Sequence, residues 1–317
     1  MRAIDLREDT LCWVEVDDPP QPGPGEVTLA VRATAVNRAD LMQRAGLYPP
    51  PKGASPILGL EAAGTIAAVG EGVVGWSVGD RAMALLSGGG YAERVTCPAG
   101  HLLPVPPHLD DTDAAALPEV VATVVQSLLV EGALQPGERV LVHAGGSGVG
   151  TMAVQLCRAI GCPVWVTAGS DDKIARCVDL GAEGGANRHD ERYVDLGRFD
   201  VILDPVGAAY LEDNLRALRT GGRLVVIGLL GGRKAPLDLG RLLVKRLRVV
   251  GTVLRSRSDE EKTHLMTRIR RDHLHQLDSG ALGPVVHAVM DIADADAAHA
   301  LLASNRTTGK IVLRVAK

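Results

Sequence analysis

The chain has 317 residues, of which 46% are hydrophobic and 23% charged, a composition typical of a folded protein large enough for two domains. Its formal net charge of −4 lacks the strong positive balance of proteins that bind the phosphate backbone, so no nucleic-acid partner is expected. The five cysteines contain no C-x-x-C pair, which argues against a disulfide framework or a cysteine-based zinc site. Residues 1–16 carry charges where a signal peptide needs an apolar core, which predicts a cytoplasmic protein that does not associate with a membrane.

The first third of the chain alternates short apolar runs with glycine- and proline-rich segments. The runs with the composition of strands lie at 27–36, 62–69, 81–86 and 91–97. Short strands separated by turn residues are typical of hairpins. This part of the chain is therefore expected to form a small, mainly antiparallel β domain.

From about residue 110, expected helices alternate with short apolar strands. The segment 111–113 can cap a helix at 114–131. The strands expected after it lie at 139–144, 164–168, 201–203 and 223–227, the helices between them at 149–160, 172–180 and 210–218, and the last elements at 260–277, 285–290, 295–302 and 310–315. Apolar strands that alternate with helices indicate a parallel sheet covered on both faces.

A glycine-rich turn, Gly145-Gly-Ser-Gly-Val-Gly150, joins an apolar strand to the following helix. Free N–H groups and the positive end of the helix dipole at such a turn can bind a pyrophosphate. Compared with the dinucleotide fingerprint G-x-G-x-x-G, Gly145 and Gly150 match and Ser147 replaces the middle glycine, which leaves Gly148 as the expected position of closest approach. With Val149, these residues form a predicted nucleotide site. The alternative is an ordinary glycine-rich turn between a strand and a helix.

The end of the next strand indicates which nicotinamide cofactor is used. An NAD enzyme places a carboxylate about 20 residues after the turn to bind the ribose 2′-hydroxyl, but this position holds Ala168. Ser170 and Lys173 follow as a hydroxyl and a cation, and Arg188 can add a bidentate contact. Because no acid repels a 2′-phosphate, these residues predict NADPH; the alternative for Lys173 is a solvated helix position.

Five segments spread over nearly the whole chain carry more distinctive motifs. They are AVNRADLMQR at 35–44, GASPILGLEAAG at 53–64, HAGGSGVG at 143–150, LRSR at 254–257 and GKIV at 309–312. Together they resemble the zinc-free quinone oxidoreductases of the medium-chain dehydrogenase/reductase superfamily, most closely the tumour-suppressor-inducible subgroup. The resemblance implies an α/β protein with a chaperonin-10-like, mainly antiparallel β catalytic domain at 1–115 and 256–317, and a Rossmann domain with a doubly wound parallel sheet at 116–255. It also implies NADPH and usually a homodimer.

Zinc separates this family from the alcohol dehydrogenases that share its architecture. In those enzymes a cysteine precedes the R-x-D of the first motif and a histidine lies between Gly and Glu of the second, whereas this sequence has Asn37 and Leu60 there. A catalytic zinc needs about three ligands of the Cys, His or carboxylate type. The resemblance therefore implies no metal, and Glu61 is interpreted as a structural carboxylate.

The resemblance also implies which residues surround the nicotinamide. Asn37 and Thr123 are expected to position the ring or the substrate, and Tyr48 to donate a proton or to form a polar wall of the pocket. A tyrosine pKa of about 10 suits a hydrogen-bond donor better than a base; the alternative for Tyr48 is a loop tyrosine held by the prolines that follow it. Further positions that match the cofactor site of relatives are Gly207, Gly228, Leu229, Leu254, Arg255 and Asn305. His143 and Asp204, each at the end of a buried strand, are expected to be structural.

Hydride transfer without a metal requires a substrate that already accepts electrons well, such as a quinone or an activated enone. The predicted function is therefore NADPH-dependent, zinc-independent reduction of such a small molecule. Two alternatives are an enoyl-thioester reductase and an NADPH-binding structural or redox-sensing protein with little turnover. The apolar segment 248–254 is expected to be an exposed edge strand of the Rossmann sheet, which favours a homodimer.

Overall fold

The computed structural model describes residues 1–315 and divides the chain into two compact units. One unit, here the β-rich unit, comprises Met1–Ala122, Leu254–Gly280 and the chain from Pro284 onward; the other, the parallel-sheet unit, comprises Thr123–Val253 and Ala281–Gly283. The boundary between Ala122 and Thr123 lies inside the helix at Pro118–Val124. The start of this helix belongs to the β-rich unit, because the backbone N–H of Glu119 donates to the Glu61 carboxylate of that unit. The β-rich unit resumes at Leu254 and includes Arg255, whose side chain is hydrogen-bonded to other residues of the β-rich unit.

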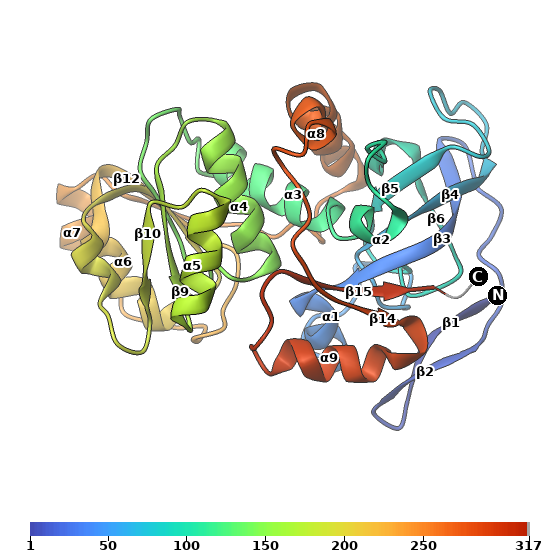
Figure 1. Ribbon diagram of the computed structural model, residues 1–317, viewed down its shortest axis with the longest axis horizontal. Coiled ribbons are helices and arrows are strands. Elements are labelled where there is room, and N and C mark those ends of the chain that lie inside the picture. Colours follow the sequence, from blue (N-terminus) through green and yellow to red (C-terminus); the bar gives the residue numbers. More distant parts are fainter. Residues whose placement is uncertain (316–317) are drawn as a thin grey trace. The chain divides into compact units, whose positions relative to one another are not determined.

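A mainly antiparallel sheet, predicted from the alternating strand pattern, is confirmed in the β-rich unit (Figure 1). Its strands are β3 (Glu26–Val36), β4 (Glu61–Val69), β5 (Arg81–Leu85), β6 (Arg94–Pro98), β7 (Leu102–Pro104), β14 (Val286–Asp291) and β15 (Lys310–Arg314). The order is β14-β15-β3-β4-β5-β7, with β6 paired to β3, and only the β14–β15 pair is parallel. A separate hairpin is formed by β1 (Arg2–Arg7) and β2 (Thr10–Glu15).

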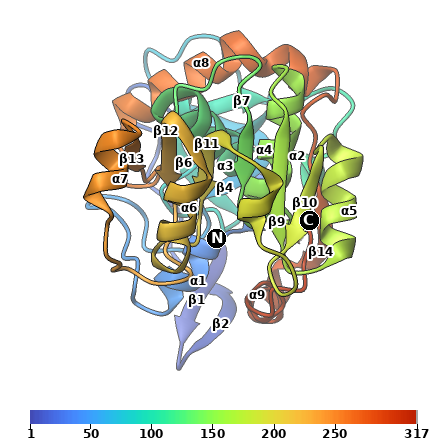
Figure 2. The same ribbon diagram turned by 90° about the vertical axis from the view of Figure 1, so that its left-hand side faces the viewer.

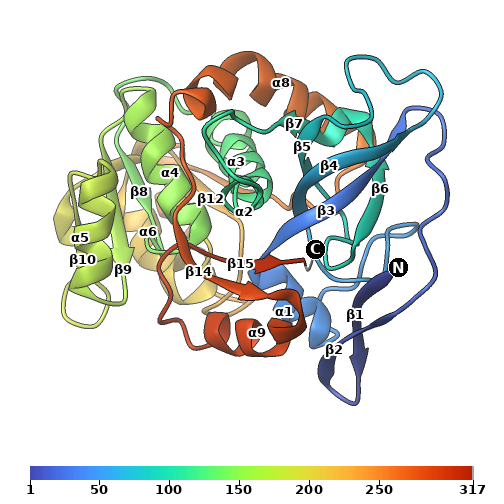
Figure 3. The same cartoon turned by 45° about the vertical axis from the view of Figure 1, so that its right-hand side comes forward.

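The helices of this unit lie against the sheet. They are α1 (Arg38–Arg44), α2 (Asp111–Ala114), the start of α3 (Pro118–Val124), α8 (Asp259–Asp278) and α9 (Ala295–Ala303). In Figure 3, α9 runs beside α1 and β15, and α8 contacts β7. The buried core is almost entirely aliphatic, with Tyr91 as its largest side chain.

The parallel-sheet unit has the predicted doubly wound arrangement. Its strands are β8 (Val140–Val142), β9 (Val164–Ala168), β10 (Gly184–Asn187), β11 (Phe199–Asp204), β12 (Leu218–Val226) and β13 (Arg248–Gly251). The helices are α4 (Gly148–Ala159), α5 (Asp171–Leu180), α6 (Leu211–Ala217) and α7 (Leu239–Val244), and Figures 1 and 2 show α4 and α5 on one side of the sheet and α6 and α7 on the other. All pairs are parallel in the order β10-β9-β8-β11-β12-β13, so the order reverses between β8 and β11. Such sheets bind ligands at the carboxyl ends of the strands beside this reversal.

The single helix expected at 114–131 is wrong. Three segments occupy this region: α2, α3 and a π-helical segment at Val125–Glu131. Pro118 has no N–H to continue a helix but fits the first turn of a new one. The cap is Asp110 instead of 111–113, because its carboxylate accepts the Asp113 N–H at 2.8 Å. Within residues 1–315, only these three segments taken together, Asp111–Glu131, are long and apolar enough to cross a membrane, and most of this stretch is buried, as in the core of a folded protein.

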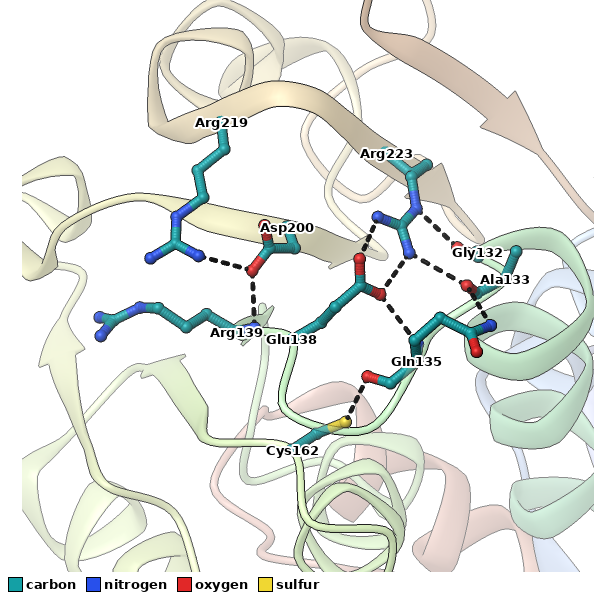
Figure 4. A network of polar contacts seen from close by, with 9 residues as sticks. All are labelled: Gly132, Ala133, Gln135, Glu138, Arg139, Cys162, Asp200, Arg219 and Arg223. Atoms are coloured by element: carbon teal, nitrogen blue, oxygen red, sulfur yellow. Dashed lines mark hydrogen bonds and ion pairs between the residues drawn. The ribbon is translucent and has the colours of Figure 1, made fainter.

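A partly buried ion pair ties the amino ends of the parallel strands to the preceding turn (Figure 4). The Arg223 guanidinium, in β12, lies 2.6 Å from Glu138 and donates to the carbonyl oxygens of Gly132 and Ala133 at 2.7 and 3.1 Å. Glu138 lies two residues before β8, so this cluster lies at the opposite edge of the sheet from the carboxyl ends of the strands.

Candidate nucleotide and substrate sites

The glycine-rich turn has the geometry expected of an anion site. Ser147 is the N-cap of α4, and its hydroxyl accepts the Gly150 N–H at 3.0 Å. A Cβ at Gly145 would lie 2.6 Å from the side chain of Val166, and a Cβ at Gly150 would lie 2.5 Å from the carbonyl oxygen of Ala144. Only glycine fits at either position. Because α4 begins at Gly148, its first N–H groups and the positive end of its dipole lie at the turn.

Two cations lie beside the end of β9. The side chain of Lys173 covers Gly146, and the guanidinium of Arg188 lies 3.4 Å from where a Gly169 Cβ would be. Burial and the charge of Arg188 lower the pKa of the Lys173 ammonium, so the two positive charges are close enough to repel. Ser170 is the N-cap of α5 and its side chain makes no cap hydrogen bond. Two neighbouring cations and a hydroxyl make a site suited to a phosphate.

The loops that follow β11 and β12 pack against each other. The Asp204 carboxylate accepts the N–H groups of Val206 and Gly207 at 2.6 and 3.1 Å. Gly207 has a φ of 82°, which glycine adopts without strain. A Cβ at Gly228 would lie 2.7 Å from the Pro205 carbonyl oxygen, so the two loops approach closely. Leu229 follows on the second loop with half of its surface exposed.

His143 is a buried structural residue, as predicted. Its Nδ1 lies 2.9 Å from the Thr167 hydroxyl and its Nε2 lies 2.7 Å from Oδ1 of Asn214. Asn214 Nδ2 donates to Asp204 at 3.0 Å, so Oδ1 must accept and the proton of His143 is on Nε2. Burial lowers the pKa of His143 to about 4. The chain of bonds supports the Asp204 loop, and sequence reasoning missed Asn214, a polar residue in a helix with no motif around it.

Four polar groups of the β-rich unit form one cluster around a buried ion pair, where β3, β4, β15 and α3 meet. The Lys310 ammonium lies 2.7 Å from Glu61 Oε1 and donates to Asn37 Oδ1 at 2.6 Å and to the Val36 carbonyl oxygen at 3.1 Å. Asn37 Nδ2 donates to Glu61 Oε1 at 2.9 Å, and the Glu119 N–H donates to Oε2 at 2.9 Å. Glu61 is fully buried and Lys310 is nearly so.

Lys310 was missed by sequence reasoning, although the GKIV segment that contains it was noted. Within the cluster the Asn37 amide is engaged on both sides, by Lys310 and by Glu61, and its place beside the nicotinamide stays a prediction. Leu60, which replaces the histidine that binds zinc in the alcohol dehydrogenases, is a buried core residue. Among residues 1–315, no group of three His, Cys, Asp or Glu side chains is placed to hold a metal ion.

Asp40 lies next to this cluster and was also missed. Its carboxylate accepts the N–H groups of Asn37 at 2.7 Å and Gly59 at 3.0 Å, which fixes the start of α1. Complete burial raises the pKa of Asp40 to about 6. Next to it, the Tyr91 hydroxyl lies 3.1 Å from Nε2 of the buried His299.

Tyr48 is half-buried in the loop after α1, and Arg255 holds that loop. The Arg255 guanidinium donates to the Tyr48 carbonyl oxygen at 3.2 Å, to the Gln43 side chain at 2.6 Å and to the Ser87 carbonyl oxygen at 2.9 Å. It also lies 5.4 Å from the centre of the Tyr48 ring. Burial raises the pKa of Tyr48, and the charge of Glu119 adds to this effect. The phenol therefore stays protonated at neutral pH and is able to donate a hydrogen bond.

The other predicted site residues lie apart along the chain. Thr123 is half-buried in the last turn of α3, and Leu254 is buried directly after the parallel-sheet unit ends. Asn305 follows α9 with a φ of 57°, and its Oδ1 accepts a hydrogen bond from Arg38 at 2.6 Å.

Comparison with known proteins identifies the family. The family model described as alcohol dehydrogenase GroES-like domain matches residues 23–107, and the one described as zinc-binding dehydrogenase matches residues 148–270. Among curated proteins, the human synaptic vesicle membrane protein VAT-1 homolog is 37% identical over 219 residues, which are 67% of this chain and 55% of that protein. A polyketide synthase from Mycobacterium tuberculosis, described as mycocerosic acid synthase-like, is 34% identical over 65% of this chain and 10% of its own length. The chain thus spans about half the length of the VAT-1 relatives and a tenth of the synthases.

Solved structures match over the whole chain. An NAD-dependent alcohol dehydrogenase is 30% identical with a TM-score of 0.86 and 100% of both chains covered. Escherichia coli quinone oxidoreductase complexed with NADPH is 28% identical, with a TM-score of 0.85 and 99% and 98% of the two chains covered. The CurK enoyl reductase is 26% identical with a TM-score of 0.85 and 99% of both chains covered. Together with the full-length motifs, these matches show that the chain belongs to the zinc-free, quinone-oxidoreductase-like family of the medium-chain dehydrogenases/reductases.

Proposed function

We propose that this protein is an NADPH-dependent, zinc-independent reductase of quinones or related activated enones. The observation that carries the proposal is the basic end of β9, where Ala168 is followed by the adjacent cations Lys173 and Arg188. A ribose 2′-phosphate needs such a site, whereas a free 2′-hydroxyl prefers a carboxylate. The similarity to a quinone oxidoreductase that binds NADPH supports the same assignment.

The residues present fit a dinucleotide. The first N–H groups of α4, at Gly148 and Val149, would hold the pyrophosphate, and Ser147 and Gly150 form the cap that fixes them. Ser170, Lys173 and Arg188 would hold the 2′-phosphate, while Gly207, Gly228 and Leu229 line the loops at the carboxyl ends of β11 and β12. When bound, the reduced nicotinamide supplies the hydride for the reduction.

In the β-rich unit, Tyr48 is the side chain best suited to contact substrate. Its hydroxyl is protonated at neutral pH, because burial raises the pKa of the phenol. It can donate a hydrogen bond to an acceptor oxygen on which negative charge develops. Arg255 keeps the loop in place by donating to the Tyr48 carbonyl oxygen, and its positive charge lies close to the aromatic ring of Tyr48.

A second candidate, an enoyl-thioester reductase, is favoured by the relatives. The M. tuberculosis polyketide synthase matches two thirds of this chain, and the CurK enoyl reductase matches nearly all of it. The third candidate, an NADPH-binding protein with little turnover, is consistent with the VAT-1 homolog, whose name describes a membrane protein of synaptic vesicles.

Steady-state NADPH oxidation with matched acceptors separates these candidates. A panel of quinones, simple enones and enoyl thioesters is tested with the same protein preparation. The proposal expects kcat/KM to be highest for a quinone or simple enone. Highest kcat/KM with an enoyl thioester would favour the second candidate, and NADPH binding without turnover of any acceptor would favour the third.

We further propose a homodimer that forms through the edge of the parallel sheet. Among residues 1–315, β13 pairs only with β12, and exposed apolar residues of α7 lie next to it in the chain. Leu239, Leu243 and Val244 are 66%, 77% and 73% exposed, and Val249 of β13 is 40% exposed. An edge with open backbone groups and an apolar surface favours association. Light scattering should give a dimer at micromolar concentration and a monomer for Leu243→Glu; a monomeric wild type would refute the proposal.

A cytoplasmic location is also part of the proposal. All five cysteines are free thiols and four of them are buried, which suits a reducing compartment. Fractionation of cells that produce the protein, followed by immunodetection, tests this location.

A further inference from the structure

The two charges next to Asn37 allow its amide only one orientation. An ammonium can only donate and an ionised carboxylate can only accept. Lys310 therefore faces Asn37 Oδ1, at 2.6 Å, and Glu61 faces Nδ2, at 2.9 Å. A flipped amide would place its NH2 group against the ammonium and its oxygen against the carboxylate. Both contacts would be repulsive, and the Glu61 carboxylate, which is fully buried, has little water to screen them.

The ion pair is also complete in hydrogen bonds, so it is a fixed part of the fold. Three oxygen atoms surround the three donors of Lys310: the Val36 carbonyl oxygen, Asn37 Oδ1 and Glu61 Oε1. Both oxygen atoms of Glu61 accept hydrogen bonds, and one of these bonds holds the second residue of α3. A buried charge without its partner is strongly unfavourable. Lys310 and Glu61 therefore depend on each other, and Asn37 depends on both.

We propose that Lys310 and Glu61 are positioning residues that act through Asn37. Their ion pair orients the amide of Asn37 and fixes the first turn of α3, the helix that carries Thr123 further along. Both Asn37 and Thr123 are residues that the sequence predicts at the reaction site. The kinetic consequence of this inference rests on the proposed function, whereas the orientation of the amide is measurable without turnover.

The first test observes the Asn37 amide directly. The chain contains four asparagines, Asn37, Asn187, Asn214 and Asn305, so labelling with ¹⁵N-asparagine gives few side-chain NH2 signals, and Asn37→Asp identifies the pair from Asn37. In the wild type these two protons should exchange slowly with solvent. In Lys310→Met and in Glu61→Gln the exchange should become at least about tenfold faster. The signal of Asn214, in the other unit, is the internal control.

Unchanged exchange of the Asn37 NH2 protons in both variants would overturn the proposal, because the amide would then be oriented without the ion pair. Faster exchange of all asparagine signals would also overturn it, since the variants would then have loosened the whole protein. Acceleration confined to Asn37 supports it.

The second test separates positioning from stability. Lys310→Met alone leaves Glu61 as a buried unpaired charge and should lower the denaturant midpoint of unfolding. The double variant Glu61→Gln/Lys310→Met removes both charges and should recover part of that loss. If the pair positions Asn37, kcat stays at least about tenfold below wild type in both variants, while the NADPH dissociation constant changes less than about twofold.

Arg223 and Glu138 supply the control, since they form an ion pair between a buried arginine and a partly buried glutamate at the amino ends of the parallel strands (Figure 4). Arg223→Met should lower the unfolding midpoint without the tenfold loss of kcat. Recovery of both midpoint and kcat in the Glu61→Gln/Lys310→Met variant would overturn the proposal, because the pair would then act on stability alone. If the wild type turns over no acceptor, the proposed function fails, and the exchange of the Asn37 amide protons still decides whether the ion pair orients it.

Discussion

Replacing Lys173 by alanine should weaken NADPH binding and leave NADH binding nearly unchanged. Lys173 and Arg188 lie close together at the end of β9, and repulsion between them is part of the reason that the pKa of Lys173 is lowered. A 2′-phosphate between them would relieve this repulsion and form charge-assisted hydrogen bonds with both. NADH has no phosphate there, so it gains nothing from either cation.

The size of the effect follows from the surroundings of Lys173. Its side chain is half-buried against Gly146, and Arg188 remains in the variant to neutralise part of the phosphate charge. Losing one charge-assisted contact at such a site costs about 1–2 kcal/mol. The dissociation constant of NADPH should therefore rise about 5- to 30-fold. The loss should shrink at high ionic strength, because salt screens partly exposed charges.

Fluorescence titration of both cofactors measures this difference, with two controls on the same helix. Lys173→Arg keeps the positive charge and should retain most of the affinity for NADPH. Arg176 is half exposed and paired with Asp179 at 4.0 Å, so Arg176→Ala should change neither affinity. An equal loss of NADPH and NADH affinity in Lys173→Ala would refute the assignment of a 2′-phosphate site.

Three further predictions concern other parts of the molecule. Tyr48→Phe should lower kcat/KM by about tenfold or more with NADPH affinity unchanged; full activity across quinones and enones would make Tyr48 a wall of the pocket. The purified protein should contain no stoichiometric zinc, because Asn37 and Leu60 stand where ligands are needed, and elemental analysis that finds about one zinc per chain, lost together with activity, would contradict this. His143, with a folded pKa of about 4, stays neutral as the pH falls whereas the unfolded chain gains a proton below about 6.5. Its contribution to stability is therefore lost between these values, and from pH 7.5 to pH 5 the unfolding free energy of wild type minus that of His143→Gln should fall by about 2 kcal/mol; a constant difference would refute the neutral assignment.

Two buried carboxylates change the unfolding free energy in the opposite direction from His143 over the same pH range. Burial raises the pKa of Asp40 and of Asp204 to about 6. Their folded-state pKa values lie above the unfolded value, so they favour folding below about pH 4, and this contribution is lost as the pH rises through 6. The pH dependence of the wild type alone mixes the two effects, which is why the comparison with a His143 variant is needed.

Local sequence patterns were sufficient to predict the bounds of elements that carry an unbroken apolar run or a strong N-cap. The strand at β9 has its predicted bounds, and α4 starts within one residue of the prediction because Ser147 is a strong N-cap followed by apolar helix residues. The prediction of one continuous helix through Pro118 was wrong. The apolar pattern continues without a break through Pro118, but proline has no N–H, and a new helix begins there. The short strand β10, Gly184–Asn187, carries no apolar run and is held by pairing with β9. Pairing of this kind is a tertiary effect that local patterns do not contain.

The same limit applies to the candidate site. The glycine turn and the basic end of β9 are local in sequence, and the motif reasoning found them. Lys310 contacts Asn37 and Glu61 across more than 240 residues of chain, so no spacing rule connects them. Arg255 likewise reaches Gln43, Tyr48 and Ser87 across 168 to 212 residues of chain. The resemblance matched the LRSR and GKIV segments, but only the folded chain assigns partners to their charged side chains.

The preference for NADPH in turnover of a quinone is the most direct test of the account. The measurement is kcat/KM for NADPH and for NADH with the same quinone, using protein treated with a chelator. The account predicts turnover that the chelator leaves unchanged and a ratio of at least about fivefold in favour of NADPH, the smallest effect expected of one charge-assisted phosphate contact. Equal kcat/KM for the two cofactors, or activity that the chelator abolishes, would contradict it.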